Sequence, residues 1–223
     1  MSASFAAKLV AWQKKHGRHD LPWQGTRDPY VIWVSEIMLQ QTQVATVIPY
    51  YNRFLARFPD VTTLAAAPLD EVLRLWSGLG YYSRARNLHG SAQEIVAAHG
   101  GRFPRRFEEV AALPGVGRST AAAICVFAFG KRHAILDGNV KRVLARYGGV
   151  KGYGGDRKIA ETLWQEAQRL LPQRNVETYT QGLMDLGATV CTRSKPRCPV
   201  CPVHGGCVAY RRGWTGTVPA PRP

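Results

Sequence analysis

Four of the five cysteines lie close together near the C-terminal end of the sequence, at Cys191, Cys198, Cys201 and Cys207. The N-terminal stretch has the pattern of an amphipathic helix rather than a signal peptide, so a reducing compartment is expected. There, clustered cysteines bind metal more often than they form disulfides. Four thiolates suit a zinc ion or an iron–sulfur cluster, although zinc ribbons usually have two Cys-x2-Cys pairs and this spacing has one. The fifth cysteine, Cys125, is predicted to be a small buried residue.

Two acidic residues lie among apolar neighbours and could carry out acid–base chemistry. Glu36 lies within the apolar stretch Val31–Met38. Burial disfavours an ionised carboxyl group, so Glu36 could keep its proton at neutral pH and act as a general acid. The alternative, favoured by periodicity alone, is a carboxylate on the solvated face of a helix. Asp137 follows Ala134–Leu136 and is predicted to be a helix N-cap, which is compatible with a catalytic role.

The segment Leu113–Gly117 is typical of a tight turn between two helices. Gly115 and Gly117 can adopt positive backbone angles, and the turn leaves backbone N–H groups at the start of the next helix, near Arg118 and Ser119. Such a helix N-terminus binds phosphate without reading sequence. A plain helical hairpin is the alternative.

A second glycine loop, Gly78–Tyr82, precedes a helix that carries Arg84 and Arg86. Its two tyrosines could belong to the core. They could also be wedges that enter a base stack while the arginines hold the flanking phosphates.

Apolar residues recur with a period near 3.6 along most of the chain, which predicts an all-α fold of about ten helices. No alternating window indicates a strand, and no apolar run is long enough to cross a membrane. The predicted helices span 5–15, 30–39, 44–58, 69–76, 85–98, 107–113, 119–129, 139–147, 157–171 and 176–186.

The chain has 223 residues, of which 30 are Lys or Arg and 15 are Asp or Glu, giving a net charge of +15. This excess favours a polyanionic partner such as nucleic acid, although charge alone also fits a merely basic protein. The segment from residue 191 onward has six basic and no acidic residues: Arg193, Lys195, Arg197, Arg211, Arg212 and Arg222.

In combination and order, these motifs resemble the endonuclease III superfamily of DNA glycosylases. The resemblance depends on Leu113–Ser119, on Leu136–Arg142 and on the four cysteines. Within the superfamily, Val34–Gln43 and Gly78–Asn87 are similar to the adenine DNA glycosylases. The similarity covers nearly the whole chain.

The resemblance implies an all-α protein of two helical domains. A six-helix barrel with a helix–hairpin–helix would span 21–133, and an iron–sulfur domain would comprise 1–20 and 134–223, with a DNA-binding groove between them. It also implies a 4Fe–4S cluster on the four cysteines. The expected partner is double-stranded DNA containing mispaired adenine, bound by a monomer in the cytoplasm at the nucleoid, with no membrane association.

The implied reaction is that of a monofunctional DNA N-glycosylase of base excision repair, which flips out adenine mispaired with 8-oxoguanine or guanine. Glu36 would protonate the adenine and then help to activate water. Asp137 would stay ionised and stabilise the oxocarbenium-like sugar. Lyase relatives have a lysine at position 119, which forms a Schiff base, whereas this chain has Ser119.

The resemblance extends to further residues by position. In the substrate pocket and DNA wedge it implies Gln41, Tyr81, Ser119, Asn139 and Gln181. For DNA phosphate contact it implies Gly115, Gly117, Arg84, Arg86 and Lys141, and Lys141 could alternatively give weak Schiff-base chemistry.

Family members usually continue into a Nudix-like domain that recognises 8-oxoguanine, and no such domain is expected within this chain. A weaker preference for 8-oxoguanine over guanine is therefore expected. Three alternatives remain: a thymine glycosylase acting on G·T mispairs, a lyase for oxidised pyrimidines, and a non-catalytic DNA-binding module.

Overall fold

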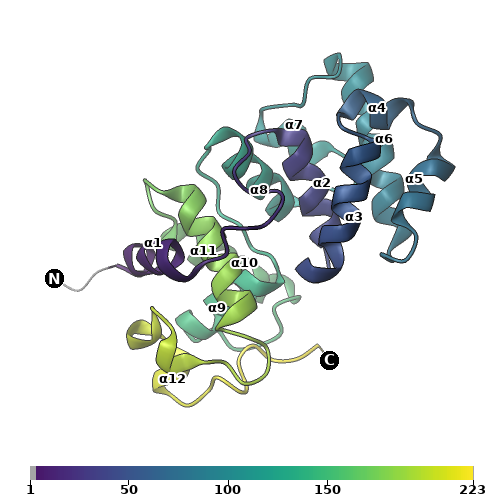
Figure 1. The fold of residues 1–223 in the computed structure, drawn as a ribbon. Coiled ribbons are helices and arrows are strands. Elements are labelled where there is room, and N and C mark those ends of the chain that lie inside the picture. Colours follow the sequence, from purple (N-terminus) through teal and green to yellow (C-terminus); the bar gives the residue numbers. More distant parts are fainter. Residues whose placement is uncertain (1–3, 223) are drawn as a thin grey trace. The chain divides into compact units, whose positions relative to one another are not determined.

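The computed structural model describes residues 4–222, and over this range the chain is helical with no strand. The expectation of an all-α fold is thus confirmed (Figure 1). The described residues form twelve α-helices and two short 3₁₀ helices. The pairing of Tyr153 with Ala220 is an isolated bridge. No helix in this range is long and apolar enough to cross a membrane.

The chain divides into two compact units. One comprises His19–Gly130, and the other comprises the chain up to Arg18 together with the chain from Lys131 onward. The helices of the first unit are α2 (Pro29–Leu39), α3 (Val44–Arg57), α4 (Val61–Ala66), α5 (Leu69–Trp76), α6 (Tyr82–His99), α7 (Phe107–Ala112) and α8 (Arg118–Phe129). Those of the second are α1 (Phe5–His16), α9 (Gly138–Gly148), α10 (Arg157–Leu170), α11 (Val176–Thr189) and α12 (Val208–Arg211), with 3₁₀ helices at Cys198–Val200 and His204–Gly206.

The first unit has seven helices where the sequence predicted six. The additional helix, α4, is six residues long and rich in β-branched residues, so it has little helical period. Its start is nevertheless encoded, because the Asp60 carboxylate accepts the backbone N–H of Thr63 at 2.7 Å. Val61 and Leu64 anchor it in the core.

Helix α2 runs through the core of the first unit. It begins with Pro29 after the N-cap Asp28, whose carboxylate accepts the N–H of Tyr30 at 2.9 Å. It packs against α3 and α8. Seven of its eleven residues are buried, including Trp33 and Met38 with no exposed surface. A helix buried on most sides holds its few polar side chains in fixed positions. Cys125, on the neighbouring helix α8, is fully buried as predicted.

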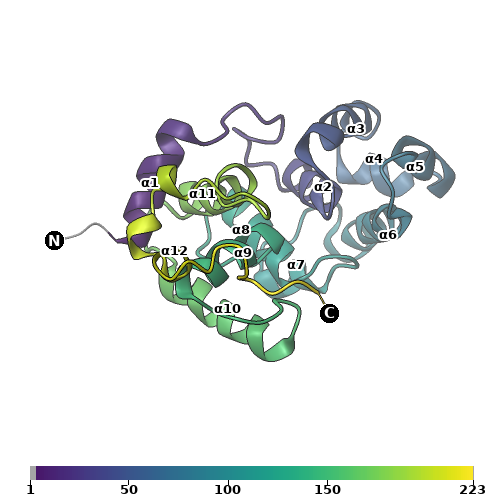
Figure 2. The ribbon, with the colours of Figure 1, turned by 90° about the horizontal axis from the view of Figure 1, so that it is seen from below.

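In the second unit, α1 lies beside α11 in both views, and α9 contacts α10, α11 and α12 (Figures 1 and 2). Two glycines allow these helices to approach closely. A Cβ atom on Gly187 would lie 2.7 Å from the Cβ of Asn139, and one on Gly149 would clash with Val208. Helix α9 is therefore the central element of this unit. Its start packs against α11 and its end packs against α12.

Candidate functional site

Glu36 is the one charged residue in the sequence of α2, and its side chain is half-buried. Its chain neighbours Ser35 and Ile37 are buried. The half-buried position lies between the two possibilities that the sequence left open, a buried general acid and a carboxylate on the solvated face of a helix. The general-acid role of Glu36 stays a prediction.

The C-terminal end of α2 is bound by Arg84 from the first turn of α6. Its Nη1 atom donates to the carbonyl oxygens of Ile37 at 3.1 Å, Met38 at 2.7 Å and Gln40 at 2.6 Å. Its Nη2 atom lies 3.2–3.4 Å from three further oxygens: Thr42 Oγ1, Leu79 O and Gly80 O. Arg84 is only 7% exposed. The prediction that it contacts a DNA phosphate is therefore wrong, because its terminal nitrogens already bind protein oxygens.

The predicted wedge residues Gln41 and Tyr81 share an uncommon backbone conformation. Their φ angles are +57° and +50°, in the left-handed region that residues with a side chain seldom adopt. Gln41 is exposed, and the side chains of Tyr81 and Tyr82 are 57% and 40% exposed. The alternative in which both tyrosines belong to the core is wrong.

The predicted hairpin is the loop between α7 and α8. Val116 N–H donates to the carbonyl of Leu113 at 3.0 Å, which closes the turn. Gly115 has φ +77°, and a Cβ atom there would lie 2.9 Å from Asn87 Cβ. Gly117 was also expected to have a positive angle, but its φ is −82° and it is the N-cap of α8. The N-cap Gly117 makes no side-chain cap hydrogen bond. Backbone N–H groups at a helix start can bind a phosphate, and the phosphate contact of Gly115 and Gly117 stays a prediction.

Hydrogen bonds link this hairpin to the segment that follows α2. Gln40 Nε2 lies 3.3 Å from Gly115 O and 3.4 Å from Thr120 Oγ1. Ser119 lies half-buried in the first turn of α8, and Arg86 is exposed on α6. One unit therefore brings together the end of α2, the glycine loop and the hairpin, three segments that are far apart in sequence.

Asp137 is the N-cap of α9, as predicted, and its carboxylate accepts the N–H of Val140 at 2.8 Å. Loss of surrounding water raises the pKa of this carboxyl group above its usual value. Backbone N–H groups and the charges of Arg142 and Lys141 act in the opposite direction. Lys141 is half-buried one turn further along. Asp137 belongs to the second unit and Glu36 to the first.

Two arginines on α9 join this helix to the first predicted metal ligand. Arg142 donates to Asn139 Oδ1 at 2.8 Å and to the carbonyl of Cys191 at 2.7 Å. Arg146, 3% exposed, approaches Cys191 Sγ at 3.4 Å and donates to the carbonyl of Thr192 at 2.7 Å. The helix capped by Asp137 therefore also orders the loop that begins at Cys191. The predicted pocket residue Asn139 takes part in this contact.

The four clustered cysteines line one pocket of the second unit. Burial raises the pKa of the Cys201 thiol to about 11, and the neighbouring sulfurs add to this effect. Burial likewise raises the pKa values of Cys198 and Cys207. Four thiolates so close together need a compensating positive charge. Among residues 4–222 no three His, Cys, Asp or Glu side chains form a group that could hold a metal ion.

Gln181, predicted to line the adenine pocket, is half-buried on α11, and its Nε2 donates to Asp185 Oδ1 at 2.9 Å. The same buried carboxylate accepts Arg18 Nε at 2.8 Å and the N–H of Arg18 at 3.0 Å. Sequence reasoning missed Asp185, because an acidic residue within a helical pattern gives no signal that its partner lies 167 positions away.

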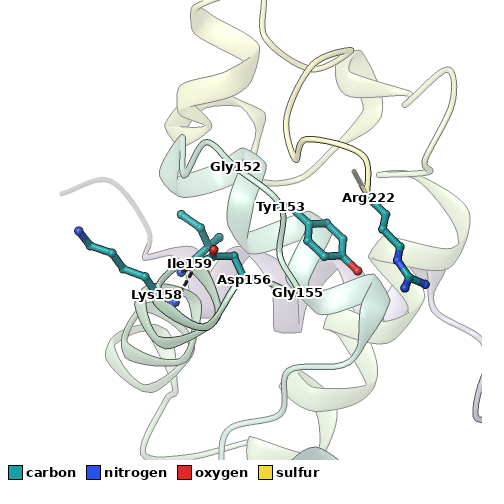
Figure 3. A pocket seen from close by; sticks show the side chains of 7 residues that line it. All are labelled: Gly152, Tyr153, Gly155, Asp156, Lys158, Ile159 and Arg222. Atoms are coloured by element: carbon teal, nitrogen blue, oxygen red, sulfur yellow. Dashed lines mark hydrogen bonds between the residues drawn. The ribbon is translucent and has the colours of Figure 1, made fainter.

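A separate cavity of about 630 Å³ in the second unit contains none of the predicted site residues (Figure 3). It is lined by Gly152, Tyr153, Gly155, Asp156, Lys158, Ile159 and Arg222. The Asp156 carboxylate accepts the backbone N–H of Lys158 at 2.9 Å and so caps α10, while the Lys158 side chain extends away from it (Figure 3).

Known DNA repair proteins resemble this chain in sequence and in fold. Residues 34–169 match the family model of the HhH-GPD superfamily base excision DNA repair proteins. The chain is 46% identical over 205 residues to the adenine DNA glycosylase of Buchnera aphidicola subsp. Acyrthosiphon pisum, covering 92% of this chain and 59% of that protein. It therefore spans about three fifths of the length of this curated relative.

Two solved structures have the same fold. A thermostable thymine-DNA glycosylase superposes with a TM-score of 0.83 at 32% identity, covering 93% of this chain and 95% of that one. Endonuclease III in a non-covalent DNA complex superposes with a TM-score of 0.75 at 24% identity, covering 93% of this chain and 94% of that one. The chain belongs to the HhH-GPD superfamily of base excision DNA repair proteins.

Proposed function

We propose that this chain is a monofunctional DNA N-glycosylase that releases adenine mispaired with guanine or 8-oxoguanine in duplex DNA. The observation that carries the proposal is the half-buried position of Glu36, the one acidic residue in a helix whose sequence is otherwise almost entirely apolar. The 46% identity to an adenine DNA glycosylase supports adenine as the base. The net charge of +15 suits a DNA partner, and we expect a monomer acting at the nucleoid.

In the proposed reaction, the Glu36 carboxyl group donates its proton to N7 of the extruded adenine. The bond from C1′ to N9 then breaks, and its electron pair leaves with the base as neutral adenine. The ionised carboxylate of Asp137 stabilises the oxocarbenium-like sugar. Water attacks C1′ and gives its proton to Glu36, which restores the acid and leaves an abasic site. Strand cleavage is not expected, because Ser119 has no amine with which to form a Schiff base.

A panel of duplexes tests the choice of base. Under single-turnover conditions followed by alkali, we expect strand breaks at adenine in A·8-oxoguanine and A·G duplexes, and little or none at G·T. Borohydride should trap no covalent adduct. Breakage confined to G·T would replace the proposal with the second candidate, a thymine glycosylase, which the similarity to a thymine-DNA glycosylase structure favours. No breakage on any duplex would leave a non-catalytic DNA-binding module.

The four cysteines are proposed to hold a 4Fe–4S cluster. Their thiols line one pocket, and Arg146 lies against Cys191 Sγ, where a buried cation would offset the negative charge of a thiolate-bound cluster. When bound, the cluster supplies cross-links that hold the loop from Cys191 to Cys207, and with it Arg193, Lys195 and Arg197, in one conformation. These three basic residues are proposed to contact the DNA backbone.

Metal analysis checks the cluster. The purified chain is expected to contain four iron and four acid-labile sulfide per molecule. Cys198→Ser should lose most of both. Cys125→Ala, at the fully buried fifth cysteine, is the matched control and should keep the iron content of the parent. One zinc per chain without sulfide would contradict the assignment.

A further inference from the structure

We infer that Arg84 is a positioning residue that holds Gln41 and Tyr81 in left-handed conformations, so that both side chains are presented together to the DNA base stack. The inference depends on the proposed function, because it concerns how the target base leaves the stack. The inference assigns a role to the buried residue that holds the backbone of Gln41 and Tyr81, and it adds nothing to the roles of these two side chains.

One guanidinium group connects the two segments in which these residues lie. On one side it binds the last carbonyls of α2 and the Gln40 carbonyl, directly before Gln41. On the other it binds the carbonyls of Leu79 and Gly80, directly before Tyr81. Each residue with a positive φ angle therefore follows a carbonyl that Arg84 holds in place.

These conformations need an external support. A left-handed backbone is unfavourable for a residue with a side chain, so each segment would relax without the bond that holds it. The last carbonyls of a helix also lack partners within the helix and carry its negative dipole end, which a buried cation satisfies. The Arg84 carbon Cζ also lies 5.4 Å from the ring centroid of Tyr81 and 5.5 Å from that of Trp76.

Placing Arg84 in the core costs free energy, and a role in stability alone does not explain that cost. The Arg84 Nε atom is buried and has no hydrogen-bond partner, and burial lowers the pKa of the guanidinium. A buried donor without an acceptor is destabilising and calls for an explanation. The need for one planar group that reaches both segments supplies that explanation. Lysine cannot replace Arg84, since an ammonium group is a single donor centre and lacks the separate nitrogens with which the planar guanidinium reaches both segments.

The first test measures unstacking directly. A duplex carries 2-aminopurine beside an A·G mispair, and every protein carries Glu36→Gln so that the base is not released. At saturating protein, the Glu36→Gln protein should raise the fluorescence strongly. Arg84→Lys and Tyr81→Ala should each lose most of this rise, and the double variant should lose little more than either alone. Arg74→Lys, on the exposed face of α5, is the matched control and should keep the full rise.

The second test uses rates without the Glu36 substitution. Arg84→Lys should lower single-turnover release of mispaired adenine about tenfold, equivalent to ~1.4 kcal/mol. The loss should be much smaller for an adenine opposite an abasic-site analogue, where less stacking must be broken. If Arg84→Lys does not fold, Thr42→Val removes one acceptor of Nη2 and should act in the same direction.

Equal losses on both duplexes, or additive losses in the double variant, would overturn the inference and leave Arg84 as a stabilising residue only. If the parent unstacks DNA and Arg84→Lys does not, but no base is ever released, the proposed reaction fails while the positioning role stands. If Arg84→Lys unstacks DNA as the Glu36→Gln protein does, the positioning role fails whatever the reaction.

Discussion

Glu36→Gln is expected to abolish adenine release while DNA binding and folding persist. The substitution keeps the shape of the side chain but removes the proton that the departing base needs. Loss of general-acid catalysis of this kind costs about 10²–10⁴-fold in rate. Single-turnover kinetics on an A·G duplex measure the loss, and a binding titration on the same duplex shows whether the complex still forms.

The matched control for this substitution is Glu94→Gln on the exposed face of α6. It removes the same charge from the same unit, so its rate should equal that of the parent. A Glu36→Gln variant that releases adenine at the rate of the Glu94→Gln variant would remove Glu36 from the mechanism.

Asp137→Asn should separate activity from stability. Asparagine caps a helix as well as aspartate does, so the bond to Val140 N–H can persist. The ionised carboxylate that would stabilise the sugar cation is lost, and such electrostatic losses cost about 10²–10³-fold in rate. Because burial raises the pKa of Asp137, its ionised form costs folding free energy at neutral pH, and the variant should be as stable as the parent or more stable.

The pH dependence follows from the direction of that shift. A folded-state pKa above the unfolded value means that the folded protein takes up a proton first as the pH falls. The parent therefore gains stability relative to Asp137→Asn on acidification. The melting temperature of Asp137→Asn minus that of the parent should be largest at neutral pH and should fall as the pH is lowered through the raised pKa. A parent that instead loses stability relative to Asp137→Asn on acidification would mean that backbone N–H groups, Arg142 and Lys141 outweigh burial.

Local sequence signals were sufficient for much of this protein. The 3.6-residue period predicted ten of the twelve α-helices in the described range, because burying one face of a helix requires that spacing. Asp137 was predicted as an N-cap from its immediate neighbours, since capping involves only residues within the first turn. The two α-helices that were missed, α4 and α12, are six and four residues long, too short for a period.

The sequence by itself determined the all-α class, the superfamily and the residue types available for chemistry. What Arg84 and Gln181 contact was decided only by the tertiary structure. The sequence suggested a DNA phosphate for Arg84, where the fold supplies protein oxygens, whereas the role of Gln181 in a substrate pocket stays a prediction. Arg84 binds carbonyls up to 47 positions away, and Gln181 shares a buried carboxylate with Arg18 from the other end of the chain. The physical reason is that a polar side chain binds the hydrogen-bond partners that folding brings near it, and the local sequence does not encode which distant carbonyls or carboxylates those are.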